Sequence, residues 1–173
     1  MSVTYKSNGS ARYEVEEYPS HKLFSIADKE VTYSIPAPNT DKLAEKLLLE
    51  FEHAQGISEL DIRQEIDISP ELLEMAWEET ARDGQASELT PGELVELIHS
   101  HLASHIENYM AWRLLRADIG HVFFKDIKDH GRVVSFKAKP VKSVEAAKYT
   151  FCSIRDDEQG FCFVSVEEGS LRP

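Results

Sequence analysis

The order of elements between residues 69 and 138 constrains the fold of this chain most strongly. Two helix starts are clear: Ser69 is an N-cap followed by proline, and Thr90 forms a capping box with Glu93. An N-cap hydroxyl and a Glu at the third helical position satisfy backbone N–H groups that otherwise lack partners. Apolar residues at helical spacing predict a further helix from about Ser104 to Ala117.

A β-hairpin is predicted directly after these helices. The runs 121–127 and 132–138 are rich in β-forming residues, and the charged turn between them ends in Gly131. Helix, link, helix, helix, strand, turn, strand is the order of a winged helix. In such domains the third helix is the usual reader of nucleic acid, and the hairpin is the wing.

The rest of the chain predicts further small elements. Runs 12–18, 22–28 and 30–36 read as short strands, which must curl into a small barrel or pack on something. A helix is predicted from Asp41 to Ala54, a short helix or irregular link over 58–67, and a hairpin over 149–166. The fold class is therefore α+β, in four parts: a small β-barrel-like region (1–38), a linking helix (39–66), a winged-helix domain (67–140), and a C-terminal β-hairpin and tail (141–173).

The charge of the chain is unevenly distributed. The 173 residues carry a net charge of −12, yet residues 111–150 hold nine Lys and Arg against four acids, a local charge of +5. The remainder is therefore −17. A local patch, rather than the average, determines which partners a protein attracts. An acidic chain can thus bind a polyanion locally, because more distant charges are screened.

The cations on the third helix and the wing are the candidate RNA-binding residues, since they could neutralise backbone phosphates. They are Arg113, Arg116, Lys125, Lys128, His130, Arg132, Lys137 and Lys139. Trp112 is expected in the core, whereas strand alternation places one of Phe123 and Phe124 outside, available to stack on a base.

No active site emerges from the residue pattern. His101 and His105 would share a helix face, but the Glu that follows the first histidine in metalloprotease helices is replaced by Leu102. Asp156 and Asp157 fit a turn better than a metal site. No apolar run approaches the length of a membrane span. Cys152 and Cys162 are expected to be reduced, in the predicted C-terminal hairpin.

Several segments resemble the N-terminal region of bacterial and plastid ribonuclease II-type 3′→5′ exoribonucleases. The segment "VTYKSNGSARYEVEEY" of this chain resembles the first strand pair of that region. The segments "LLEMAWEE", "ELTPGELVELI" and "ENYMAWRLLRADIGHVFF" resemble its winged-helix part. The matching positions are Ala76, Trp77, Thr90, Glu93, Leu94, Leu97, Ala111, Trp112, Leu114, Leu115 and Phe124. Family members usually carry Phe-Gly or Tyr-Gly where this chain has His99-Ser100.

The resemblance implies an accessory role for this chain. In that family hydrolysis occurs in a separate domain with clustered Asp residues and magnesium, so no cofactor is expected here. The leading hypothesis is an RNA-binding accessory module that guides single-stranded RNA in processing or decay, with a catalytic domain or a protein as partner. The alternatives are a protein-interaction winged helix with an acidic face and a duplex-DNA regulator. The expected location is the cytoplasm, or an organelle stroma or matrix.

Overall fold

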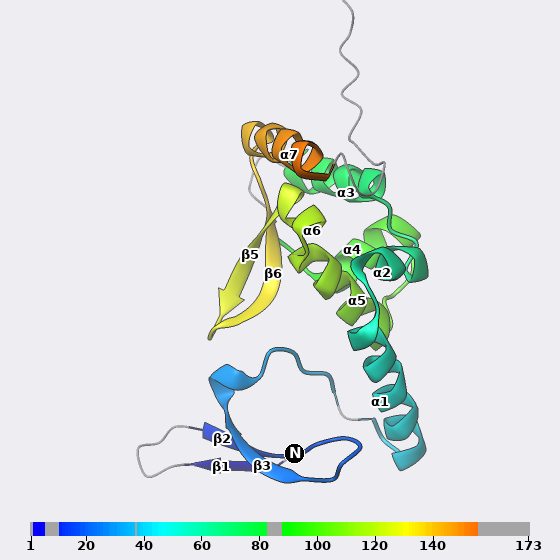
Figure 1. The fold of residues 1–173 in the computed structure, drawn as a ribbon, viewed down its shortest axis with the longest axis vertical. Helices are drawn as coiled ribbons and strands as arrows, with labels where there is room; N and C mark the ends of the chain where they lie inside the picture. Colours follow the sequence, from blue (N-terminus) through cyan, green and yellow to red (C-terminus); the bar gives the residue numbers. More distant parts are fainter. Residues whose placement is uncertain (1, 6–10, 37, 83–87, 156–173) are drawn as a thin grey trace, which may run out of the picture.

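The computed structural model describes residues 2–5, 11–36, 38–82 and 88–155 (Figure 1). A winged-helix body occupies the centre. A small N-terminal sheet lies beyond the tip of its hairpin, and the last helix lies at the opposite end.

The N-terminal region is an open antiparallel sheet with the strand order β1-β2-β3. Its strands are β1 (Ser2–Tyr5), β2 (Ala11–Glu16) and β3 (Leu23–Ala27). The described strands do not close into the predicted barrel. The predicted strand over 30–36 is wrong, because a 3₁₀ turn, η1 (Asp28–Glu30), ends β3 and an extended link follows. β1 supplies the third strand of the sheet instead. It pairs with β2, and together they form the first strand pair that the family resemblance implies.

Two helices connect this sheet to the body. In α1 (Asp41–Gly56), the Thr40 hydroxyl accepts a hydrogen bond from the Leu43 N–H at 3.3 Å, and α1 runs two residues beyond the predicted end. α2 (Glu59–Glu65) shows that the ambiguous segment is a short helix, whose capping box joins Ser58 and Asp61. α2 buries Ile62 in the core of the body.

The predicted winged-helix order is confirmed. Its elements are α3 (Pro70–Arg82), β4 (Glu88–Leu89), α4 (Pro91–His99), α5 (His105–Arg116), α6 (Asp118–Phe123), β5 (Phe124–Asp129) and β6 (Arg132–Ala138). The strands form an antiparallel sheet in the order β4-β6-β5. The predicted caps are present: Thr90 and Glu93 form a capping box, and the Ser69 hydroxyl accepts from the Leu72 N–H at 3.3 Å.

The first run of the predicted hairpin is half helical, because α6 precedes β5. Gly120 permits α6 to lie against the end of α5, since a Cβ there would sit 2.3 Å from the Leu115 carbonyl oxygen. Phe123 and Phe124 are both fully buried, so the prediction of one exposed ring is wrong. Strand alternation does not apply, because the chain changes from helix to strand between them.

The wing turn agrees with the sequence. His130 and Gly131 have φ angles of +47° and +84°, and two consecutive positive values identify a type I′ hairpin turn. Glycine adopts this conformation without steric cost, which explains its position.

A single apolar core joins α1–α6, the β4-β6-β5 sheet and α7. Trp112 is buried as expected, and its indole N–H donates to the Val133 carbonyl at 3.1 Å. The Trp77 indole donates to the Lys139 carbonyl at 2.8 Å. The largest fully buried side chains are Phe123, Phe124, Phe136, Ile62, Ile68, Leu73, Leu94, Leu114, Leu115, Ile119, Val95 and Val144.

The predicted C-terminal hairpin is wrong in its first arm, because residues 149–155 belong to a helix, α7 (Val141–Arg155). Val144, Ala147 and Phe151 recur at helical spacing and pack against the core. This tertiary packing overrides the β propensity of the run. Cys152 lies in α7, while the second arm, with Cys162, Asp156 and Asp157, is outside the described residues.

Candidate nucleic-acid interface

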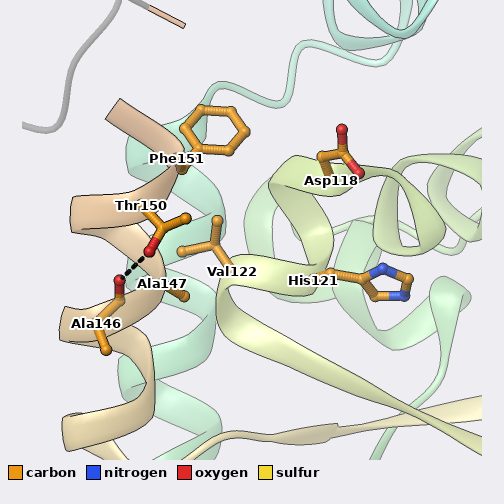
Figure 2. Close-up of a pocket in the computed structure, with 7 residues that line it drawn as sticks. All are labelled: Asp118, His121, Val122, Ala146, Ala147, Thr150 and Phe151. Atoms are coloured by element: carbon orange, nitrogen blue, oxygen red, sulfur yellow. Dashed lines mark hydrogen bonds between the residues drawn. The ribbon is translucent and has the colours of Figure 1, made fainter. Parts of the chain in front are cut away.

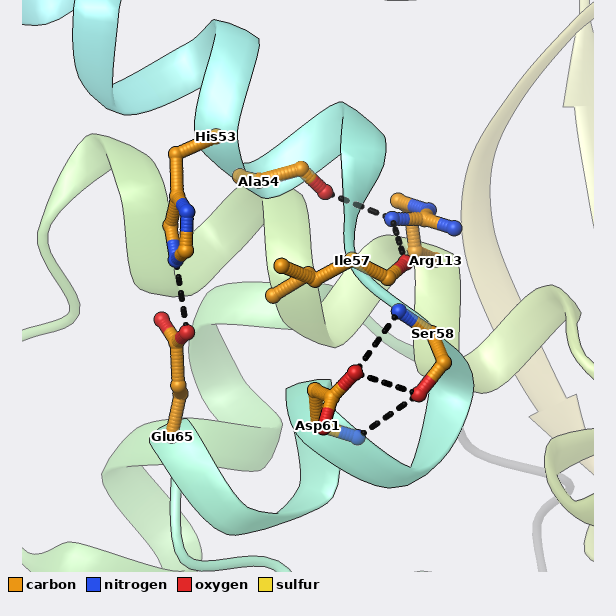
Figure 3. Close-up of polar contacts among 7 residues, drawn as sticks. All are labelled: His53, Ala54, Ile57, Ser58, Asp61, Glu65 and Arg113. Atoms are coloured by element: carbon orange, nitrogen blue, oxygen red, sulfur yellow. Dashed lines mark hydrogen bonds and ion pairs between the residues drawn. The ribbon is translucent and has the colours of Figure 1, made fainter.

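Arg113 is directed toward α1 and not toward solvent. Its Nη1 donates to the carbonyl oxygens of Ala54 at 2.5 Å and Ile57 at 3.1 Å (Figure 3). Carbonyls at a helix end lack intrahelical partners, and Arg113 supplies donors for them. The guanidinium therefore joins α5 to α1.

Further polar contacts surround this junction (Figure 3). His53 Nε2 lies 2.6 Å from Glu65 Oε1, which joins α1 to α2. Hydrogen bonds from the Ser58 hydroxyl and backbone N–H hold the pKa of Asp61 below its usual range. These contacts are structural, since they cap and connect helices.

Aromatic rings from outside α5 cover the part of this helix that carries Tyr109 and Trp112. Tyr33, from the link before α1, lies with its ring centroid 5.0 Å from that of Tyr109 and 5.2 Å from that of Trp112. Phe51 of α1 is 4.9 Å from Tyr109. Burial, together with the nearby Tyr109, raises the pKa of Tyr33. Because α1 and the link pack on α5, the predicted reader helix cannot enter a duplex groove in this arrangement.

Arg116, at the end of α5, is partly exposed but has two neighbours. Its Nε lies 3.8 Å from Asp126 Oδ2, and its guanidinium carbon lies 4.7 Å from the Trp112 ring centre. Asp126 is also 3.0 Å from His121 Nε2. Arg116 can rotate toward a ligand only by giving up these contacts.

Three further candidate cations are engaged with other groups. Arg132 forms an ion pair with Asp28 of η1, which also accepts from the Tyr13 hydroxyl at 2.8 Å. Lys139 donates to the His121 carbonyl. The exposed His130 ring lies 3.7 Å from the carboxylate of its neighbour Asp129.

The remaining candidates are Lys125, Lys128 and Lys137, here called the wing lysines. All three are exposed, and within the described part of the chain their side chains form no hydrogen bond or ion pair. Lys125 and Lys137 are directly opposite each other in the β5–β6 register. Like charges at such positions destabilise a sheet, so this pair does not serve folding.

One carboxylate is directly opposite a wing lysine in the described sheet register. Glu88 of β4 is opposite Lys137 on its other side, but its Oε2 accepts from the buried Ser135 hydroxyl at 2.7 Å. Lys128 follows an irregularity in the ladder at Ile127/Lys128. The wing lysines thus lie on one exposed hairpin that also carries Asp126 and Asp129. The carboxylate of Asp126 lies near Arg116 and His121, and that of Asp129 lies near His130.

A cavity of about 470 Å³ lies between α6 and α7, beside the base of the wing (Figure 2). Phe151 and Thr150 of α7 and Asp118 and His121 of α6 contribute to its walls. The pairing of His121 with Asp126 resembles that of a base and its orienting acid. Thr150, however, donates to the Ala146 carbonyl of its own helix at 3.1 Å, so it is not activated as a nucleophile.

The histidines do not have the arrangement that the sequence suggested. His101 lies between α4 and α5, where its Nε2 is 2.9 Å from Glu107 Oε1, so it shares no helix face with His105. Within the described residues, no three His, Cys, Asp or Glu side chains are grouped as metal ligands.

Comparison with known families identifies the body of the chain. Residues 59–143 match the family model described as the winged helix domain of ribonuclease II. No curated protein and no solved structure matches the chain. Among the described helices, none combines the length and apolar composition needed to cross a bilayer.

Proposed function

Residues 59–143 are a ribonuclease II-type winged-helix domain, and from this premise we propose that the chain is a non-catalytic RNA-binding accessory module of a 3′→5′ exoribonuclease. The module guides single-stranded RNA toward a catalytic domain in processing or decay. Under this proposal, magnesium-dependent hydrolysis belongs to that separate domain.

The observation that carries the proposal is the facing pair of Lys125 and Lys137, with Lys128 on the same hairpin. Two unpaired ammonium groups in register repel each other in the free protein. A phosphate between them would replace this repulsion with attraction, and would release counterions that the RNA backbone holds. Binding of a polyanion would therefore explain why two lysines face each other at this position.

The buried state of α5 supports recognition of single strands over duplexes. Reading a duplex by the usual winged-helix mode requires the third helix to enter the major groove. Here Tyr33 and Phe51 pack on that helix, and Arg113 is bound to α1. Contacts of the wing lysines with phosphates carry no base information, so sequence-tolerant binding is expected.

Binding of labelled single-stranded RNA, duplex RNA and duplex DNA, each at about 50 and 200 mM salt, tests the proposal. Three phosphate contacts on a single strand predict a slope near −2 in log K against log salt, or roughly a 20-fold loss of affinity over this range. Equal or tighter binding to duplex DNA would contradict the proposal. So would absence of RNA binding at the lower salt.

A further inference from the structure

A groove of about 590 Å³ lies where three separate segments meet. They are the turn at Tyr18, residues 33–36 and 38 of the link, and the side of α1. Figure 1 shows α1 extending from the winged-helix body toward the N-terminal sheet. None of the described residues that line this groove belongs to the wing.

The walls of the groove are mostly apolar and remain partly open to solvent. Ile35, Pro36 and Pro38 line one side, and Ala44, Leu47, Leu48 and Phe51 line the other. Leu48 is 41% exposed, and Leu43, four residues before the groove residue Leu47, is 53% exposed. The apolar surface thus continues from the groove toward the start of α1, which suits a polypeptide segment better than a small molecule.

A row of carboxylates flanks the groove. Asp41, Glu45 and Glu52 follow one stripe of α1, together with Leu48, at spacings that place them on one helix face. All three are exposed, and within the described residues they have no ion pair. The neighbouring stripe differs, because Lys46 pairs with Glu50 there at 3.5 Å.

We propose that this groove binds a polypeptide segment that carries leucine-like side chains flanked by Lys or Arg. The apolar walls take the leucine-like side chains, and the carboxylate row pairs with the flanking cations. The same carboxylates repel RNA, so this site and the wing lysines take partners of opposite charge. The inference does not depend on RNA binding by the wing.

The test uses the full chain and two synthetic peptides followed by NMR chemical-shift perturbation. One peptide is amphipathic and built of Leu and Lys; in the other, Glu replaces Lys. The Leu/Lys peptide is expected to saturate and to shift the signals of Leu47, Leu48 and Phe51. The Leu/Glu peptide is expected to bind at least tenfold more weakly.

Variants locate the binding site. Leu48→Asp and the pair Glu45→Lys with Glu52→Lys are each expected to weaken binding of the Leu/Lys peptide at least tenfold. Matched controls on α4, Leu97→Asp and Glu96→Lys, change equally exposed residues and should leave binding unchanged. If Leu48→Asp fails to fold, the exposed Glu45/Glu52 pair decides the question.

Three results would overturn the inference. They are no saturable binding, equal binding of the two peptides, and equal loss in the groove and control variants. Sedimentation of the chain alone tests whether a second copy of the chain occupies the groove. A dimer that Leu48→Asp abolishes would mean that a second copy fills it, and the proposed partner would be wrong.

Discussion

Arg113 of α5 donates from its guanidinium to the carbonyl oxygen of Ala54, fifty-nine positions earlier in the chain. A residue that the sequence presents as a cation on a reader helix is thereby a structural link to α1. Sequence alone cannot distinguish a role of Arg113 in stability from a role in RNA binding. Loss of this hydrogen bond is expected to lower stability and to leave RNA affinity unchanged.

Arg113→Met is expected to destabilise the chain without weakening RNA binding by the folded protein. It leaves the partly buried Ala54 and Ile57 carbonyls without their donor, and a loss of about 1 kcal/mol is expected, the lower end of the cost of an unsatisfied acceptor. Chemical denaturation measures this loss. Arg82→Met, which removes only an exposed pair with Glu79, should cost well under about 1 kcal/mol. A selective loss of RNA affinity in Arg113→Met would assign Arg113 to the interface.

The ion pair between Asp28 and Arg132 is expected to couple the N-terminal region energetically to the wing. Because both are only partly buried, a double-mutant cycle with Asp28→Asn and Arg132→Gln should give a coupling of about 0.5–1 kcal/mol. Denaturation of the four proteins measures it. A coupling of zero would mean that the ion pair does not hold the wing to the sheet in solution.

Glu107 makes stability depend on pH. Partial burial acts to raise its pKa, but hydrogen bonds involving Ser104 and His101 outweigh this, so the pKa lies below the ordinary value of 4.5. A lowered carboxyl pKa stabilises the folded state above the unfolded pKa, and this contribution disappears as the pH falls through the folded pKa.

Glu107→Gln should therefore reduce the free energy of unfolding at neutral pH by about 0.3–1 kcal/mol, as expected for a carboxylate at a helix start. The difference from the unchanged protein should shrink as the pH falls below 4.5. Thermal unfolding across this range measures it, with the solvent-facing Glu96→Gln as control. A difference independent of pH would contradict the capping role.

Ser100 occupies the position where the resemblance to ribonuclease II-type proteins implies glycine. Its φ of +58° is left-handed, and its N–H donates to the Glu96 carbonyl at 2.8 Å to end α4. Ser100→Gly relieves a strain of about 1–2 kcal/mol, partly offset by about 0.4–1 kcal/mol of unfolded-chain entropy. A small rise in the free energy of unfolding is expected. Destabilisation would show that the serine side chain contributes more than the backbone strain.

The parts of the fold that follow local rules could be predicted from the sequence. The caps at Ser69 and Thr90 and the turn at Gly131 act within a few residues, and all are present. The helix at 118–123 and α7 could not be predicted, because they depend on contacts between distant segments. Gly120 shows this, because a side chain at this position would clash with the backbone of α5.

The sequence predicts which cations lie on α5 and around the wing, but not which of them remain without a partner among the described residues. Lys137 and Lys139 are two apart, which in a strand implies the same face. β6 ends at Ala138, however, so Lys139 turns to the His121 carbonyl while Lys137 remains exposed. Similarly, Asp28 gives no sign in sequence that it will pair with Arg132. Register and tertiary partners determine which cations stay available.

Charge reversal of the facing lysines tests the central claim most directly. Lys125→Glu with Lys137→Glu should lower the affinity for single-stranded RNA at least tenfold and reduce the salt slope from near −2 to about −0.7, since one of three phosphate contacts remains. Lys42→Glu, an exposed lysine on α1, is the control and should change affinity little. Unchanged affinity and slope in the folded double variant would contradict RNA binding by the wing.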